Sequence, residues 1–326
     1  GYREGAVSVG SSQIDEPIIL GQNLTKSSIF NRSGRIRMDD LMALEQSSNV
    51  YMFKIAMTMG GLSYYPYIGI ASLLRDDTLQ RLRNGYAQVG LGVPTGIDLP
   101  GETIGVIGVP DSPGKVLDIT IGQYDTYTPM QLAQYVSTIA NGGYRVQPRL
   151  LKEVRKPSQD GQTLGQLMEE IKPNILNRID NTQKEINQVK EGFRRVYYGN
   201  KGSANYYFAD TPYTAAGKTG TAEVVYFGPK KDRYGTNTIN LVHVGFAPFD
   251  KPEVAYAVVI PWASTSLKPS KYYNNLIARQ VLDKYFELKT NYEAAGMTDS
   301  VVGQKIIRQT DQEILDENQV EQTINE

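Results

Sequence analysis

Two short segments of the sequence combine side chains that are suited to chemistry on a bound ligand. Ser47-Ser48-Asn49 offers a hydroxyl and an amide, and Lys218-Thr219-Gly220-Thr221 offers a cation and hydroxyl donors. On a strand that faces a cleft, the second segment could hold a ligand, because glycine leaves room for the ligand's backbone to lie alongside the strand. Neither segment is specific when it is considered alone.

Each segment also has a plainer interpretation. Ala216-Gly217-Lys218-Thr219 is not a phosphate loop, because that motif requires a glycine at position 212, which is proline here. The segment could instead be a kinked strand with an exposed lysine. Ser47-Ser48-Asn49 could be the N-cap of a helix, a position that serine and asparagine favour, and a cap is compatible with a second role.

The composition excludes several other kinds of site. The chain has 34 Lys and Arg against 35 Asp and Glu, a net charge of -1, so charge gives no support for nucleic-acid binding. Without cysteine and with a single histidine, His243, it cannot build a structural zinc site, a cysteine nucleophile or a disulfide framework. No metal or cofactor is expected, and a Ser/His/Asp triad could use only His243. The longest apolar run, 254–263, is about half of a membrane span.

Helices are predicted mainly in the first half of the chain. Two short helices, over 38–45 and 50–59, flank the polar break at Ser47, and Thr128-Pro129 opens a third helix. The intervening stretch 89–121 is rich in glycine and proline and is expected to be a loop. Further helical periodicity covers 183–198. A terminal amphipathic helix is expected to cover one sheet face with Ile277, Val281, Tyr285 and Leu288.

The last third of the chain changes to strand periodicity and places Lys218 on the first of three strands. The strands are expected at 213–226, 240–249 and 253–262, and a turn at 248–252 joins the last two as a hairpin. The last strand is apolar on both faces. This pattern predicts a strand that is covered on both sides and is not an edge.

The acidic end of the chain is predicted to be a separate element. Residues 291–326 carry eight acidic and two basic side chains, a net charge of -6, and a single aromatic. Low hydrophobicity with excess charge favours a solvated or partly helical tail. We therefore divide the chain into a globular domain at 1–290 and an acidic tail at 291–326.

Taken together, the two segments are two of the three motifs of serine acyltransferases that react with penicillin. The chain resembles the transpeptidase domain of a class B penicillin-binding protein from about Glu16 to Lys289. The resemblance is carried, in the family's order, by 43–49, 96–102, 121–123 with Thr128-Pro129, 216–223 and 244–248. It implies an α+β fold in which helices flank an antiparallel five-stranded sheet, together with an all-helical subdomain. This chain would supply three of the five strands.

The family's third motif is missing from its expected place. Its nucleophile is the serine of a Ser-x-x-Lys motif that precedes Ser-x-Asn, and here only Ser112 has a lysine three residues later, Lys115. Because Gly114 and the strand-like residues after it offer no helix, we do not expect this pair to be the nucleophile and its base. Ser47 has no adjacent base. The resemblance therefore implies a companion N-terminal segment, upstream of Gly1, that supplies Ser-x-x-Lys and the two remaining strands. Without that segment, the last strand would lack its neighbour in the sheet.

The resemblance also implies a catalytic role for three motif residues in acyl transfer. Ser47 would relay a proton toward the leaving amine. Asn49 would hold the substrate amide and the lysine of the missing motif. Lys218 would contribute positive potential, which lowers the pKa of that other lysine, the base of the reaction.

The strand residues Thr219, Gly220 and Thr221 would bind the substrate or a β-lactam. By the resemblance, the two hydroxyls would donate to the terminal carboxylate, and the N–H of Thr221 would form half of the oxyanion hole. His243 lies on the neighbouring predicted strand, and it is expected to be structural.

The function that the resemblance implies is that of a peptidoglycan D,D-transpeptidase, which crosslinks stem peptides and is a target of β-lactams. The protein would act at the outer face of the cell membrane, anchored by an N-terminal helix absent from this sequence, beside a membrane glycosyltransferase. The alternative is a non-catalytic penicillin-binding scaffold or β-lactam sensor. An intact Ser-x-x-Lys motif upstream would favour the enzyme, and its loss would favour the alternative.

Overall fold

The computed structural model describes residues 1–21, 24–65, 77–158 and 164–294. The chain divides into two compact units, the first made of 1–149 with 173–279 and the second of 150–172 with 280–326. All of the predicted site residues belong to the first unit. The predicted acidic tail lies outside the described residues from position 295 onward, and 291–294 form the end of a helix.

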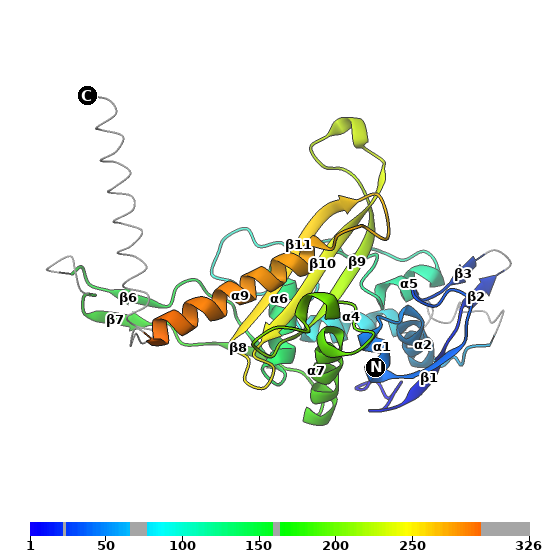
Figure 1. Cartoon of the computed structure of the whole chain (residues 1–326), viewed down its shortest axis with the longest axis horizontal. Coiled ribbons are helices and arrows are strands. Elements are labelled where there is room, and N and C mark those ends of the chain that lie inside the picture. The colour runs from blue at the N-terminus through cyan, green and yellow to red at the C-terminus, as the bar shows by residue number, and fades with distance from the viewer. Residues whose placement is uncertain (22–23, 66–76, 159–163, 295–326) are drawn as a thin grey trace. The chain divides into compact units, whose positions relative to one another are not determined.

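A three-stranded antiparallel sheet forms the centre of the first unit (Figure 1). Its strands are β9 (Ala216–Val225), β10 (Asn237–Ala247) and β11 (Val254–Ser264), in the order β11-β10-β9. In this register Val244 lies between Lys218 on β9 and Ala257 on β11. The three predicted strands and the hairpin are therefore confirmed.

The prediction from periodicity that the last strand is not an edge is wrong for the sheet of the described residues. There β11 pairs only with β10, although its residues are buried or half-buried for most of its length. Helix α6 packs against β11 on one face. Apolar side chains on both faces indicate that both faces are covered. They do not indicate whether another strand pairs with the backbone along the edge.

Helices cover both faces of this sheet. Helix α6 (Pro129–Ala140) begins with the predicted cap, in which Thr128 and Gln131 bond to each other's backbone N–H groups. Helix α7 (Gln183–Tyr198) has the bounds that its periodicity predicted, and it begins with a capping box that was not predicted. Side chains of α6 and α7 join the sheet in one core cluster, which contains Val136, Ala140, Phe193, Ala216, Val244 and Phe246.

The other face of the sheet meets α8 (Asn205–Phe208) and the first turns of α9 (Tyr273–Ala294). Asn274 Nδ2 donates to the carbonyl of Val242 at 2.8 Å. The predicted apolar stripe of α9 is wrong, because Ile277 is exposed while Ala278 is fully buried. The buried face is rotated by one residue from the one that hydropathy alone selects.

A second group of helices carries the Ser47 segment and forms a core of its own. These helices are α1 (Asp40–Glu45), α2 (Asn49–Met59), α4 (Thr78–Gln88) and α5 (Pro113–Ile119). The core of α2, α4 and α5 contains Val50, Phe53, Ala56, Met57, Leu82, Val116 and Leu117, and α1 contributes Ala43 to a separate cluster with Met38 and Tyr51. The predicted helical region is therefore present. It also carries two small antiparallel sheets, β1 (Ser12–Asp15) with β4 (Ile36–Asp39) and β2 (Ile18–Gly21) with β3 (Leu24–Lys26).

Helix α5 contradicts the prediction that 89–121 is a loop throughout. Ser112 has an extended backbone at the N-cap, and Pro113 is the first helical residue, where its missing N–H costs nothing. Val116 and Leu117 are fully buried against the other helices. Burial of these side chains outweighs the low helix propensity of Gly114, which sequence analysis treated as a helix breaker.

The remaining strands pair in twos. In the first unit, β5 (Tyr144–Val146) pairs with β8 (Ile175–Arg178), and in the second unit β6 (Glu153–Arg155) pairs with β7 (Leu167–Glu170). Among the described residues, every helix is too short or too polar to cross a membrane.

Candidate active site

The structure brings the two predicted segments together. Lys218 Nζ, on β9, donates a hydrogen bond of 2.8 Å to Ser47 Oγ in the turn between α1 and α2. The same ammonium donates to the carbonyl of Thr219 at 2.9 Å. The expectation that Ser47 has no adjacent base is therefore wrong in space, because an amine that is distant in sequence lies against its hydroxyl.

Ser47 is presented to Lys218 by a strained turn. Its φ of 59° lies in the left-handed region, a conformation that costs about 1 kcal/mol or more for a residue with a side chain. The turn is held by backbone bonds from the N–H groups of Ser47 and Ser48 to the carbonyls of Leu44 and Ala43. A strained residue that directs a hydroxyl toward a lysine is typical of a functional position.

The next serine performs the capping role that the plain interpretation assigned to the segment. Ser48 Oγ accepts from the N–H of Tyr51 and donates to the buried carboxylate of Asp15. Asp15 also accepts from Ser28 Oγ at 2.6 Å. Because Ser48 is the cap, Ser47 remains available to Lys218, so both interpretations of the segment hold for different residues.

Asn49 is the first residue of α2, and its side chain makes no strong hydrogen bond in the described part of the chain. Its amide nitrogen lies 3.5 Å from the carbonyl of Ser27, at the limit of a hydrogen bond. An amide held this loosely can bind a ligand without first breaking a strong internal bond.

Burial lowers the pKa of the Lys218 ammonium to about 8. Desolvation penalises the charged form, and the neighbouring hydroxyl and carbonyl are neutral acceptors that only partly compensate. Lys218 is therefore mostly charged at neutral pH and can still attract an anion. It loses its proton more readily than an exposed lysine does.

The rest of the Lys218 segment lies along the outer edge of the sheet. Within the described ranges β9 pairs only with β10, so the backbone groups along its other edge have no strand partner. Thr219 Oγ1 lies 2.6 Å from Ser203 Oγ, and no pattern in the sequence predicted Ser203 as a neighbour. At Gly220, an added Cβ would meet only Val242 at an ordinary distance of 3.5 Å, so the face of the sheet is not crowded there.

Gly217 is required for a different reason from the one predicted. A Cβ at this position would clash with the hydroxyl of Tyr197 and with the carbonyl of Val244. The close approach is therefore made by α7 and β10. A ligand does not need this glycine in order to reach the strand.

His243 lies beneath the site in a buried cluster with two tyrosines. Its Nε2 is 2.6 Å from the hydroxyl of Tyr197, which also bonds to Tyr256. Burial lowers the pKa of the His243 imidazole to about 3, and the charge of Lys218 acts in the same direction. The ring is neutral at physiological pH, which supports the structural role expected for it.

We expect His243 to make folding stability fall with acid. Its folded pKa of about 3 lies below the ordinary value of 6.5, so the unfolded chain binds the proton first. The contribution is complete above pH 6.5 and is lost as the pH falls toward 3, at about 1.4 kcal/mol for each pH unit. Urea unfolding of the wild type and of His243→Gln at pH 7, 6 and 5 measures this effect. Parallel losses of stability in the two proteins would contradict it.

Ser112 and Lys115 stand at the start of α5, and they do not form a reactive pair. Lys115 Nζ donates to Asp111 Oδ2 at 2.8 Å, and the ion pair is largely exposed. Ser112 and Lys115 bond to each other through their backbones, from the N–H of Lys115 to the carbonyl of Ser112. The helix that sequence analysis missed therefore does not turn Ser112 into a substitute for the missing serine.

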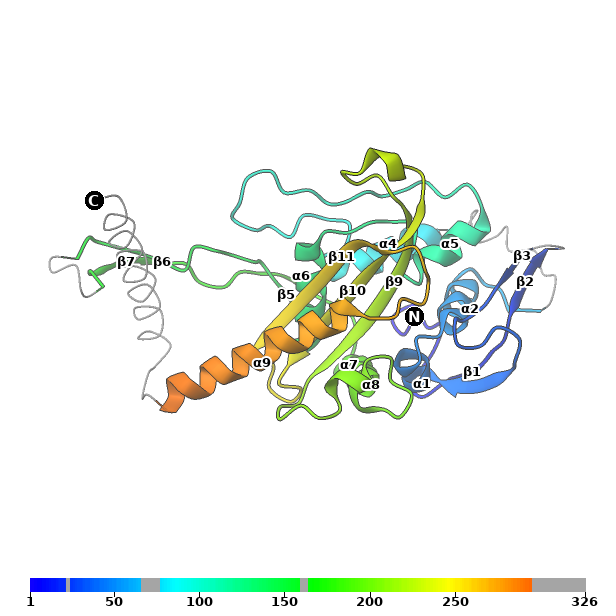
Figure 2. The same cartoon turned by 45° about the horizontal axis from the view of Figure 1, so that its top comes forward.

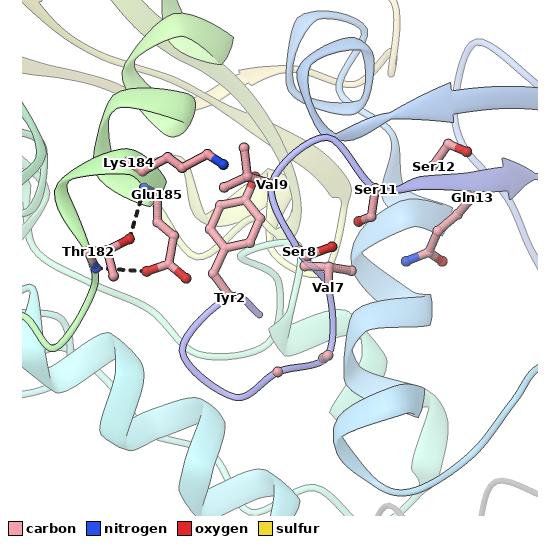
Figure 3. A pocket seen from close by; sticks show the side chains of 12 residues that line it. Tyr2, Val7, Ser8, Val9, Ser11, Ser12, Gln13, Thr182, Lys184 and Glu185 are labelled. Carbon is pink, nitrogen blue, oxygen red and sulfur yellow. Dashed lines mark hydrogen bonds between the residues drawn. The ribbon is translucent and has the colours of Figure 1, made fainter.

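A pocket of about 670 Å³ lies away from these residues, between the first residues of the chain and the start of α7 (Figure 3). Several of its polar groups are already engaged. Tyr2 donates to Asp40 at 2.6 Å, and Thr182 and Glu185 form the capping box of α7. In the part of the chain that the structure describes, no cluster of three or more Asp, Glu or His side chains could hold a metal ion.

Comparison with known proteins assigns this arrangement to a family. Residues 1–286 match the penicillin-binding protein transpeptidase domain. The chain is 43% identical to penicillin-binding protein 2A of Bacillus subtilis over 91% of its own length and 40% of that protein's. It is 27% identical to the peptidoglycan D,D-transpeptidase MrdA of Escherichia coli, over 71% of this chain and 35% of that protein. The solved structure of penicillin-binding protein 2B of Streptococcus pneumoniae R6 superposes with a TM-score of 0.79 at 31% identity, over 88% of this chain and 45% of that one.

The fold and the paired motifs define a penicillin-recognising transpeptidase domain of the α+β class. The chain belongs to the penicillin-binding protein transpeptidase family, and its relatives are class B members. It spans about 40% of the length of the first curated relatives that it matches.

Proposed function

We propose that the protein to which this chain belongs is a peptidoglycan D,D-transpeptidase of the serine type. The observation that carries the proposal is the 2.8 Å bond from Lys218 Nζ to Ser47 Oγ, which joins the β9 edge to the α1–α2 turn. The names of the relatives supply the reaction. The geometry of this chain supplies a cation, two hydroxyls and an open strand edge around a single point.

The reaction has two halves. In the first, a serine oxygen attacks the carbonyl of a D-alanyl-D-alanine bond, the C–N bond breaks, and D-alanine leaves with the proton that its nitrogen needs. In the second, an amine of a neighbouring stem peptide attacks the ester carbonyl, the serine oxygen leaves, and a peptide crosslink forms. β-Lactams enter the first half, and they form a stable ester on the same serine.

The charged form of Lys218 is the one that the proposal uses. It would attract the terminal carboxylate of the substrate, and through Ser47 it would complete a path for the proton that the leaving amine takes up. Its donor bond to Ser47 orients that hydroxyl, because Ser47 Oγ accepts from the ammonium and keeps its own proton available. Asn49, which has only a marginal internal bond, would hold the substrate amide.

The open edge of β9 would hold the substrate as an added strand. Thr219 and Thr221 would donate to the carboxylate, Gly220 would keep the edge clear, and the Thr221 N–H would stabilise the oxyanion. The neighbouring Ser203 hydroxyl, 2.6 Å from that of Thr219, would fix the threonine's rotamer before the substrate arrives. This part of the proposal is supported by the unpaired edge of β9.

The nucleophile would come from a companion N-terminal segment with a Ser-x-x-Lys motif. In support, the chain spans about 40% of the length of the first curated relatives, and Ser112 with Lys115 does not form a substitute for the missing serine and lysine. The same segment would pair with the open edge of β11. The whole protein would be anchored in the cell membrane with this domain on its outer face, and it would work beside a membrane glycosyltransferase.

The proposal is tested on the longer protein that includes the upstream segment. It should form a stoichiometric adduct with fluorescent penicillin and release D-alanine from a D-alanyl-D-alanine peptide when an acceptor amine is present. Adduct formation without D-alanine release would favour a β-lactam sensor. If neither occurs in a folded protein, the chain is part of a non-catalytic scaffold and the proposal is wrong.

A further inference from the structure

The end of the sheet beyond the Lys218 segment carries an exposed basic and aromatic surface. The β9–β10 loop, 226–236, projects past the sheet in Figure 1, and Figure 2 shows the same loop from a second direction. The β11–α9 loop, 265–272, emerges at the same end, because Ser264 and Glu223 both lie opposite Ile239. We call the following set the basic–aromatic tip: Phe227, Lys230, Lys231, Arg233 and Tyr234 of the first loop, with Lys268 and Lys271 of the second.

The cations of the tip are available for a partner. All five are exposed, and in the described part of the chain no ion pair joins their side chains to an acid. Asp232 is the only acid within the two loops. Five cations against one acid on two adjacent loops give a locally positive field on a chain whose net charge is -1.

Two aromatic rings of the tip lie in solvent instead of in the core. Phe227 is 65% exposed and Tyr234 is 51% exposed, and their rings contact each other edge to face at 5.8 Å. Beneath them Tyr226 is buried and contacts Trp262 of β11 at 5.1 Å, which ties the loop to the sheet. The loop is therefore anchored by one pair of aromatic rings and displays a second pair beside the cations.

The position of the tip follows from the direction in which a bound strand can leave the site. At the start of β9, Ala216 is buried in the core beside Phe193 and Gly217 is buried against Tyr197, so this end of the strand offers a ligand no exposed surface. Toward the end of β9, Glu223 and Val225 are exposed. From Thr221 to Phe227 the chain covers about 20 Å, at about 3.3 Å for each residue of a strand. A polymer whose carboxylate end is held at Lys218 is thus directed toward the tip.

We propose that the basic–aromatic tip binds the glycan-peptide strand from which the stem peptide extends. Its cations would pair with carboxylates of the stem peptides, and Phe227 and Tyr234 would pack on sugar faces, where an apolar ring face meets an aromatic one. This inference rests on the proposed function for the identity of the polymer. The tip would be a second contact that holds long substrates. A small β-lactam would not make this contact.

The test is co-sedimentation of the 326-residue chain with insoluble peptidoglycan from which phosphate-rich polymers have been removed. Phe227→Ser with Tyr234→Ser, and separately Lys230→Glu with Lys231→Glu, should each weaken binding by about tenfold or more. Raised salt should weaken the wild type and have less effect on the charge variant. Lys251→Glu, an exposed lysine in the turn at the opposite end of the sheet, is the matched control and should bind within about twofold of wild type.

Three results would overturn the inference. One is equal binding by the wild type and both tip variants. Another is an equal loss in Lys251→Glu. The third is binding only to walls that retain their phosphate polymers, or to vesicles containing anionic lipid, which would make the tip a general polyanion surface.

Failure of the tip and failure of the proposed function are distinguishable in the longer protein. There, the tip variants should lose about tenfold more in binding to peptidoglycan than in the rate of acylation by penicillin. If Lys218→Ala slows acylation while the tip variants bind peptidoglycan as the wild type does, only the tip inference is wrong. If the longer protein is not acylated at all, the proposed function fails, whatever the tip binds.

Discussion

Lys218→Ala is expected to slow acylation by a penicillin about 10- to 150-fold in the protein that includes the upstream segment. The estimate converts the loss of a charge-assisted contact of about 1.5 to 3 kcal/mol into a rate. Lys218 is partly buried, bonds to Ser47 and lies on an open strand edge, so its charge acts where the ligand's carboxylate would bind. Few other substitutions outside the nucleophile's motif should cost as much.

Lys115→Ala is the matched control for this prediction. Both lysines are next to a glycine in the sequence, but Lys115 pairs with Asp111 in an exposed i,i+4 arrangement at the start of α5. Exposed pairs of this kind contribute about 1 kcal/mol or less to stability and should not affect the site. The measurement is the second-order acylation rate of each variant at matched folding. Small and equal effects would mean that the Lys218 segment is only a bend in a strand.

Much of the scaffold could be predicted because its determinants are local. The capping residues of α6, the double glycine after α2 and the apolar runs of β10 and β11 each act within a few residues. The family resemblance predicted that Ser47 and Lys218 belong to one site, but the bond between their side chains was not predicted. No local pattern joins an α1–α2 turn to a strand that lies far along the chain.

The features that were missed depend on contacts between distant segments. Helix α5 exists because Val116 and Leu117 reach a core built from other helices, which outweighs the low helix propensity of Gly114. Ser203 follows α7 in an ordinary polar loop, and only the fold brings it to Thr219. The same is true of Tyr197, whose hydroxyl bonds to His243 and explains Gly217. A single sequence contains these residues but not their distances.

The pairing of Ser47 with Lys218 also sharpens the question of which serine reacts. A lysine with a pKa of about 8 beside a serine hydroxyl resembles a nucleophile with its base. At pH 7, however, about nine-tenths of such a lysine is charged. The charged amine donates to Ser47 Oγ and cannot take its proton. The strained backbone of Ser47 fixes this orientation.

We therefore expect the 326-residue chain by itself to form no stoichiometric covalent adduct with benzylpenicillin at pH 7, while the longer protein with the upstream segment is labelled completely. Intact-mass spectrometry after incubation with the drug measures both. Ser47→Ala and Ser112→Ala in the 326-residue chain are the paired controls, and the experiment is repeated at pH 9, where Lys218 is mostly neutral. A penicilloyl mass that grows from pH 7 to pH 9 and disappears only in Ser47→Ala would make Ser47 the nucleophile, with Lys218 as its base.

Labelling that disappears only in Ser112→Ala would instead mean that the exposed start of α5 reacts. Either outcome would remove the reason for assigning the nucleophile to a companion segment, because the chain would then carry a complete acylation site of its own.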